Sequence, residues 1–347
     1  MAKNDGSVLI VVLNYGGWRD TLIGLKSLLK QTYHNFKILL IDNGSQNDSA
    51  DRLKKYIVKN DANQKIIFVQ NKKNIGVAPG FAQGVDYAAD HSFEFVALFN
   101  NDAQAAPDWL EKLVSSSRKH RSFITTGLML TLDGKTIINS GDIYTRWGIP
   151  EQRDENKPVA KASSSGWIFG ATGGAVLYRT ELFNKIGNFD GKLFAYDEDV
   201  DIDWRAQLRG CGTYYEASAV VRHKVGATSK KLPGFLTTQV LQNLPVVFWK
   251  NVPARLLWPI GWRFFLAYWA FVFYKICQGD FVPAMKGVGR AIKLWPHALR
   301  ERRRIQKSKT VRAKDLKPLI KKTLPFRSVA RVRKFFHLKI DDFYDNI

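Results

Sequence analysis

Cysteine is nearly absent from this chain of 347 residues, which contains only Cys211 and Cys277. Two thiols can build neither a disulfide scaffold nor a four-cysteine zinc site, and such usage is typical of a reducing compartment. The first residues lack a basic-then-apolar stretch with a cleavage site, so we expect no export by that route. Glycine and proline are near average usage, while 45% of the residues are hydrophobic. This composition excludes a linker or a wholly disordered chain.

Acidic residues are also in deficit, with 31 Asp and Glu against 53 Lys and Arg and a net charge of +22. The excess is uneven, because residues 286–334 alone carry +16. A strongly basic segment requires an anionic partner such as nucleic acid, anionic lipid or a phosphorylated substrate. The location of the charge predicts a basic appendage, so the first 225 residues are interpreted separately.

Strand-like and helix-like segments alternate between residues 7 and 130. Short apolar runs rich in β-branched residues predict buried strands at 7–13, 37–41, 65–69, 93–99 and 124–130. Apolar residues at helical spacing predict helices at 18–31, 49–59, 79–89 and after Pro107. The alternation predicts an α/β fold with a mainly parallel sheet between two layers of helices. Residues 151–165 are polar and predict a mobile loop.

Polar clusters follow the first four predicted strands, at 14–17, 42–45, 74–80 and 100–102. Such residues are common in turns, so one cluster alone says little. Four at successive strand ends predict a ligand site, because open α/β sheets bind ligands beyond the carboxyl ends of their strands. Asp102 is the candidate ligand for Mg²⁺ or Mn²⁺, which would bind a diphosphate. The alternative is that Asp102 caps the following helix.

A second cluster places five acids within the seven residues 197–203. Crowded carboxylates raise the pKa of at least one of their number, which suits a general base. The alternative is a solvated helix N-terminus, where acids stabilise the helix dipole. The aromatic and aliphatic residues between the acids favour partial burial and therefore a site.

Seven segments together resemble family 2 glycosyltransferases of the GT-A fold, close to the rhamnosyltransferase-like branch. They are VVLNYGG at 11–17, IDNGS at 41–45, NIGVAPGFAQG at 74–84, FNNDA at 99–103, GGAVLYRTELFNKIGNFD at 173–190, FAYDEDVDIDWRAQLRG at 194–210 and VVRHKVGATS at 220–229. The resemblance implies a catalytic domain over 1–230, with a nucleotide-sugar half over about 1–130 and an acceptor half over about 131–230. It also implies an inverting transfer from a UDP- or dTDP-linked sugar.

The resemblance further implies a role for individual residues. The implied donor-binding residues are Asn14, Tyr15, Asp42, Asn74, Gly76, Asn100, Asn101 and Gly174. Asn100 replaces the first acid of the family's Asp-x-Asp motif, so Asp102 would provide most of the metal binding. His223 matches a second metal ligand of some relatives, with a structural histidine as the alternative. Asp199, the second acid of the Glu198–Asp199 pair, matches the catalytic base.

Residues 231–347 predict a helical extension that associates with a membrane. Residues 244–277 mix tryptophan, phenylalanine and basic residues, as interfacial segments do. The apolar stretch 256–273 is marginal for a spanning helix, which needs about 20 residues, and a pair of core helices is the alternative. The basic segment 286–334 would add attraction to anionic headgroups. On this interpretation, a chain ending near Lys231 should stay soluble and still bind the nucleotide sugar.

The combined expectation is a cytoplasmic enzyme, peripheral on the inner face of the cell membrane, that extends a glycan or lipid-linked oligosaccharide in cell-surface polysaccharide synthesis. One alternative is a polyprenyl-phosphate sugar synthase, which clear spanning helices would favour. Another is a basic nucleic-acid-binding protein. That alternative leaves Asp42, Asp102 and Asp199 unexplained, so we expect no nucleic-acid partner.

Overall fold

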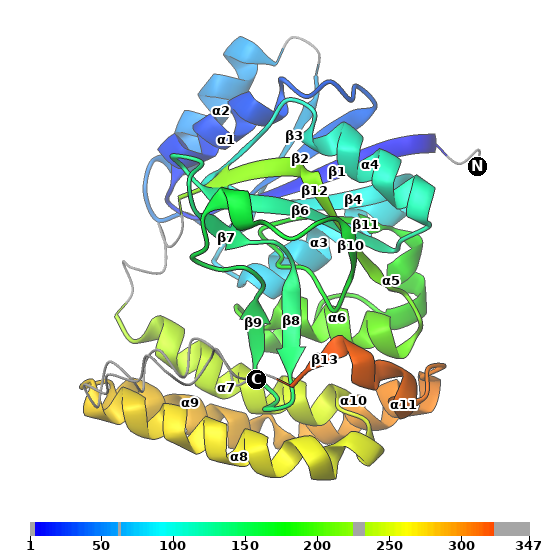
Figure 1. Ribbon diagram of the computed structural model, residues 1–347. Helices are drawn as coiled ribbons and strands as arrows, with labels where there is room; N and C mark the ends of the chain where they lie inside the picture. Colours follow the sequence, from blue (N-terminus) through cyan, green and yellow to red (C-terminus); the bar gives the residue numbers. More distant parts are fainter. Residues whose placement is uncertain (1–3, 62–63, 225–232, 323–347) are drawn as a thin grey trace.

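The computed structural model describes residues 4–61, 64–224 and 233–322. Its centre is a mixed sheet with strand order β10-β12-β6-β11-β4-β1-β2-β3, to which β5 and β7 add at β12 and β6 (Figure 1). The strands are β1 (Asn4–Asn14), β2 (Phe36–Asp42), β3 (Ile66–Gln70), β4 (Phe93–Asn100), β5 (Ala103–Ala105), β6 (Ile124–Thr131), β7 (Ile137–Asn139), β10 (Gly166–Ile168), β11 (Ala175–Arg179) and β12 (Thr213–His223). The neighbours β3, β2, β1 and β4 run parallel, whereas β11 is antiparallel to β4 and β6.

Helices cover both faces of this sheet. They are α1 (Trp18–Leu28), α2 (Ser49–Asn60), α3 (Val77–Asp90), α4 (Trp109–His120), α5 (Glu181–Ile186) and α6 (Glu198–Leu208). Alternate residues of β1 point to opposite faces, so Val8 and Ile10 pack with α1, α2 and α4, whereas Leu9 and Val11 pack with α3, α5 and α6. A strand buried on both faces needs an unbroken apolar sequence, which β1 has.

The predicted α/β fold is confirmed, and most predicted elements begin and end within two residues of the observed ones. The predicted loop 151–165 contains regular structure. Part of β9 (Pro150–Gln152) and the 3-10 helix η1 (Val159–Lys161) lie there. β9 joins a small second sheet with β8 (Asp142–Thr145) and β13 (Ile320–Lys321), in the order β13-β8-β9.

The chain after the central sheet forms a layer of helices beneath α6 (Figure 1). Its elements are α7 (Phe235–Asn251), α8 (Ala254–Cys277), α9 (Phe281–Lys293), α10 (Trp295–Ser308), α11 (Ala313–Leu316) and the 3-10 helix η4 (Lys317–Leu319). Val200 and Trp204 of α6 share one hydrophobic cluster with Leu241 and Val247 of α7. Because α6 also packs on the sheet through Ile202, it is buried between the two layers.

Buried polar contacts join α7 to α6 and to the segment that precedes it. Lys250 of α7 is 1% exposed and forms ion pairs with Asp190 and, at 3.0 Å, with Asp201 of α6. The amide of Asn251 donates to Asp201 Oδ1 at 2.8 Å. Removing α7 would take Lys250 from both carboxylates and leave Arg205 beside Asp201 and His297 beside Asp190. Breaking a buried ion pair in this way is strongly destabilising. These contacts argue against the expectation that a chain ending near Lys231 stays soluble and binds the nucleotide sugar, which stays a prediction.

α8 has a buried side and an exposed side. Leu256, Ile260, Phe264, Tyr268 and Val272 recur every four residues and face the layer's core. The Phe264 ring stacks on Phe248 of α7 with centroids 4.1 Å apart. The opposite side exposes large apolar side chains, namely Trp258, Trp262, Phe265, Leu266, Trp269 and Phe273. By length and composition α8 could cross a membrane, a test that a buried helix of a soluble protein can also pass.

Candidate active site

The register of the parallel strands brings the predicted clusters to one edge of the sheet. Asn14 at the end of β1 lies opposite Asp42 at the end of β2, and Leu13 lies opposite Asn100 of β4. The antiparallel pair of β12 and β5 contributes to this edge as well. This pairing places His223 of β12 opposite Ala103 of β5. His223 thereby comes next to Asp102, although 120 residues separate them in sequence.

Asp42 is fully buried and organises the loops around it. Its Oδ1 accepts hydrogen bonds from the Asn14 amide and the Ser45 hydroxyl, each at 2.6 Å, and its Oδ2 accepts from the Ser45 backbone at 3.1 Å. Asn14 in turn accepts from Thr21 at 2.9 Å. The contact between Asp42 and a nucleobase stays a prediction, as does that of the half-buried Tyr15. What the structure shows is that Asp42 and Asn14 fix the loop shape.

The loop before α3 is held by side-chain amides and by one glycine. The Asn43 amide donates to Asn74 Oδ1 at 3.1 Å and to the Gly76 carbonyl at 3.0 Å. Gly76 has a φ of 100°, and a Cβ there would lie 2.6 Å from the carbonyl oxygen of Phe194. A side chain at position 76 would therefore disrupt the contact between this loop and the segment that precedes α6.

The candidate metal ligands meet at the ends of β4 and β12. Nε2 of His223 lies 2.8 Å from Asp102 Oδ1 and 3.2 Å from the side-chain amide of Asn100. Both Asp102 and His223 are about 10% exposed, so they are reachable from solvent on one side. The amide of Asn101 points elsewhere and donates to Thr21 at 3.0 Å.

This pair fits a divalent cation bound together with a ligand. The described residues contain no group of three or more His, Cys, Asp or Glu side chains that could hold a metal ion. One carboxylate and one imidazole are nevertheless a suitable partial set, since Mg²⁺ and Mn²⁺ sites commonly use few protein ligands and complete their shell with water and phosphate oxygens. Nδ1 of His223 is buried and has no hydrogen-bond partner among the described residues, so only Nε2 is engaged. The predicted roles of Asp102 and His223 remain predictions.

The candidate base lies at the first turn of α6. Asp199 Oδ2 accepts from the Gly173 backbone at 3.0 Å, and Oδ1 accepts from the Val200 backbone at 2.9 Å. The next residue, Gly174, accepts a hydrogen bond from the Asn100 backbone at 2.8 Å. Residues 173–174 therefore connect the candidate base directly to the strand that carries the candidate metal ligands.

Burial raises the pKa of the three acids that begin this cluster. It raises the pKa of Asp199, although hydrogen bonds from Gly173 and Val200 oppose the shift. Burial and then the Asp199 charge raise the pKa of Glu198 well above its ordinary value and that of Asp197 to about 8. One carboxylate in such a group is readily protonated, which is the property expected of a base that must accept a proton.

The other two acids of the cluster have structural partners. Asp201 is ion-paired with Arg205 at 2.9 Å and with Lys250, and these cations outweigh burial to lower its pKa. Asp203 accepts from the Ala171 backbone at 3.1 Å, and burial raises its pKa well above the ordinary value. Both side chains are at most 1% exposed, so neither is placed to act on a ligand.

Asn243, which no sequence pattern indicated, positions the segment before the candidate base. Its amide donates to the carbonyls of Leu193, Ala195 and Tyr196 at 2.7 to 2.8 Å. Within this segment Phe194, Tyr196 and Asp197 have φ between 59° and 66°, a strained conformation for non-glycine residues. Because the contact spans about 50 residues from within an apolar run, no local pattern could have revealed it.

Comparisons with known proteins agree with this architecture. The family described as "Glycosyl transferase family 2" matches residues 7–187. The chain belongs to this family. Its relatives include a bifunctional glycosyltransferase of Dictyostelium discoideum, 27% identical over 31% of this chain and 15% of that protein. They also include the N-acetylglucosaminyl-diphospho-decaprenol L-rhamnosyltransferase of Mycobacterium tuberculosis, 26% identical over 59% of this chain and 72% of that protein.

Solved structures confirm the fold of the family 2 chain. A crystal structure of GalNAc-T7 with UDP, GalNAc and Mn²⁺ matches with a TM-score of 0.56 and 17% identity. The match covers 70% of this chain and 47% of that one, and at this identity it establishes the GT-A fold alone. The chain spans less than half the length of several relatives, the Dictyostelium protein among them.

Proposed function

We propose that the chain transfers a sugar from a nucleoside-diphosphate sugar to a hydroxyl group, with inversion at the anomeric carbon. The observation that carries this proposal is the link through residues 173–174. Gly173 donates to the candidate base Asp199, and Gly174 accepts from Asn100 beside Asp102 and His223. The proposed proton acceptor Asp199 and the proposed diphosphate-binding pair Asp102 and His223 are thus linked through only two residues. A single displacement requires both groups to act at one anomeric carbon, so they must lie close together.

Different residues of the chain have different roles in this displacement. Asp199 accepts the proton of the acceptor hydroxyl, whose oxygen attacks the anomeric carbon from the side opposite the nucleotide. Asp102 and His223 would hold Mg²⁺ or Mn²⁺, which when bound supplies positive charge to the departing diphosphate. Asn14, Asp42, Asn74 and Gly76 belong to the loops that shape the nucleotide site. No covalent intermediate with the enzyme is required.

We also propose that the enzyme acts as a peripheral protein on the inner face of the cell membrane, on a glycan or lipid-linked acceptor for cell-surface polysaccharide. Support comes from the exposed side of α8, where Trp258 is 85% and Phe273 62% exposed. Because the other side of α8 packs on α7, the helix would lie in the interface and would not be surrounded by lipid. The name of the mycobacterial relative, whose acceptor is linked to decaprenol through a diphosphate, fits this location.

A donor screen tests the proposed reaction. Nucleotide sugars are added with Mn²⁺ or with a chelator, and thermal stabilisation is measured for each. We expect one UDP- or dTDP-linked sugar to stabilise the protein in a metal-dependent manner, since ligands that bind the native state raise its stability. Nuclear magnetic resonance of the product formed with that donor then reports the anomeric configuration. A product with the configuration of the donor would refute the single displacement.

A further inference from the structure

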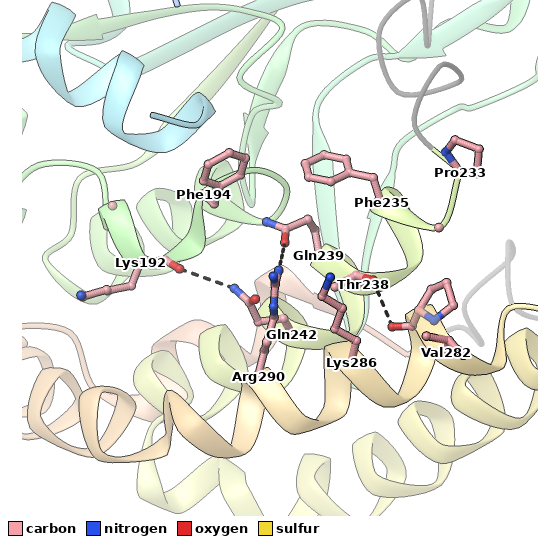
Figure 2. Close-up of a pocket in the computed structure, with 13 residues that line it drawn as sticks. Lys192, Phe194, Pro233, Phe235, Thr238, Gln239, Gln242, Val282, Lys286 and Arg290 are labelled. Atoms are coloured by element: carbon pink, nitrogen blue, oxygen red, sulfur yellow. Dashed lines mark hydrogen bonds between the residues drawn. The ribbon is translucent and has the colours of Figure 1, made fainter. Parts of the chain in front are cut away.

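A pocket of about 670 Å³ lies between the segment before α6 and the helical layer (Figure 2). Its walls come from residues 191–194, the first turns of α7 and the surface of α9. The volume is in the range of small-ligand sites. None of the residues assigned above to the donor, metal or base lines it. The pocket is therefore a separate feature of the molecule.

Two cations of α9 give the pocket its charge. Lys286 and Arg290 are four residues apart and rise from α9 towards Gln239 of α7 in Figure 2, where Arg290 donates to Gln239 Oε1 at 3.3 Å. Within the part of the chain that the structure describes, no carboxylate pairs with either cation. Like charges at this helical spacing repel each other, and an anion bound between them would remove that repulsion. Lys and Arg are also the side chains that most often bind phosphate groups.

The acids next to the pocket-lining residues in sequence already have other partners. Asp190 pairs with Lys250 and, at 2.8 Å, with His297. Asp280 accepts from Thr237 at 2.7 Å and pairs with Lys275 at 3.3 Å. The charges of Lys286 and Arg290 are thus not neutralised by these two acids.

Lys192, Thr238, Gln239 and Gln242 also line the pocket, and the rest of its walls are apolar and continue onto the exposed surface of the helical layer. Phe194 and Phe235 lie with ring centroids 6.1 Å apart on the side opposite α9. Val282 lines the pocket and is 71% exposed, and Phe281 and Met285 beside it on α9 are exposed as well. α9 contacts α8, which carries the exposed aromatic side chains. A hydrocarbon chain that leaves the pocket over Val282 would meet the surface proposed to face the membrane.

The pocket is also close to the candidate base. Phe194 precedes Asp199 by five residues, and five residues of extended chain reach at most about 18 Å. The backbone carbonyl of Phe194 accepts hydrogen bonds from Val77 and Ala78 at the start of α3, which keeps the wall of the pocket in contact with the donor loop. One ligand could therefore present a sugar hydroxyl to Asp199 and a phosphate group to α9.

We propose that this pocket binds the diphosphate of a lipid-linked acceptor, with Lys286 and Arg290 as its phosphate ligands and Val282 at the exit of the hydrocarbon chain. The inference rests on the proposed function, which supplies a sugar acceptor carried by a lipid. The same diphosphate chemistry occurs in the donor. We assign the acceptor because the pocket has an apolar exit and lies apart from Asp102 and His223.

The test uses the full chain and phosphatidylcholine vesicles that contain a polyprenyl diphosphate. Further vesicles contain the corresponding polyprenol, or phosphatidylglycerol at matched charge. The variants are Lys286→Gln and Lys286→Gln/Arg290→Gln. The control is Lys293→Gln/Arg300→Gln, which removes the same charge from exposed positions of α9 and α10 outside the pocket. Affinity for each vesicle and for soluble UDP is measured for every protein.

We expect the pocket double variant to lose at least about 10-fold in affinity for polyprenyl diphosphate, and Lys286→Gln to lose part of it, while the control and UDP binding are unchanged. Equal losses in the pocket and control variants would overturn the proposal, as would equal losses on phosphatidylglycerol. Loss of UDP binding would assign the pocket to the donor and also overturn it. Because these are binding measurements, failure of the proposed transfer reaction would be seen separately, in the donor screen.

Discussion

Replacing Lys250 by Met should destabilise the protein more than any comparable change of a surface lysine. The Lys250 side chain is 1% exposed and is ion-paired with Asp190 and with Asp201, which is 0% exposed. Removing one partner of a buried ion pair costs about 3–5 kcal/mol, because the remaining charge stays buried without compensation. Asp201 keeps Arg205 and Asp190 keeps His297, so we expect the lower half of that range.

The loss should depend on pH in a defined direction. Burial would raise the pKa values of Asp190 and Asp201, but Lys250 together with His297 at Asp190 and with Arg205 at Asp201 outweighs burial and holds both below the ordinary value. A carboxyl with a depressed folded pKa stabilises the protein above its unfolded pKa of about 3.9 and loses that contribution as the pH falls through the folded pKa. The difference between wild type and variant should therefore be complete near pH 7 and narrow below about pH 4.

Urea unfolding followed by tryptophan fluorescence measures the effect, with Lys112→Met as the control. Lys112 forms a surface pair with Asp108 at 2.7 Å and should contribute at most about 1 kcal/mol. Adding Asp201→Asn to Lys250→Met should recover part of the loss, because the uncompensated charge is then gone. If Lys250→Met costs no more than Lys112→Met, the helical layer is not held to α6 by these ion pairs and the reasoning is refuted.

Three further outcomes follow from the site and the exposed surface. Asp102→Ala should remove the metal dependence of nucleotide-sugar binding in calorimetry and leave the circular dichroism unchanged; unchanged metal dependence would reassign the metal site. Asp199→Asn should bind the donor nearly normally but turn over at least about 100-fold more slowly, and wild-type turnover would exclude it as the base. The full chain should sediment with anionic liposomes and be only partly released at about 1 M salt, where the Debye length is about 3 Å. The variant Trp258→Ser/Phe273→Ser should be released at that salt concentration, because it lacks two exposed aromatic side chains of α8. Equal retention of the two proteins would exclude α8 as the contact surface.

The sheet and the candidate donor site could be predicted because their signals are local. A strand buried on both faces must be apolar throughout, and polar residues at its end stand out against it. Asn14, Asp42 and Asn100 were found in this way, and the register of the parallel strands brings them together. The contact of His223 with Asp102 depends on the pairing of β12 with β5, which no local pattern reports.

The packing of the helical layer could not be predicted, because composition alone does not show which side of an apolar helix is covered. Residues 244–277 suggested a membrane segment, yet α7 and one side of α8 belong to the core. The basic segment suggested an appendage, yet Arg302 donates to the carbonyls of Trp249 and Val252 at the end of α7. Such contacts provide hydrogen bonds to the free carbonyl groups of a helix terminus from a residue far away in sequence. They produce no periodic pattern in the sequence. Residues 323–334 of that segment lie outside the described residues.

The five acids of residues 197–203 differ in the partners that the surrounding structure gives their charges. Cations from α6 and α7 neutralise Asp201, a backbone amide holds Asp203, and Asp199 faces Gly173 with no cation beside it among the residues that the structure describes. The acid proposed as the base is therefore one of three, with Asp197 and Glu198, whose charge no cation among the described residues compensates. The compensating Lys250 and the loop-holding Asn243 both belong to α7, which also supports α8. α7 therefore holds the segment before the candidate base and also supports the helix whose exposed side is proposed to contact the membrane.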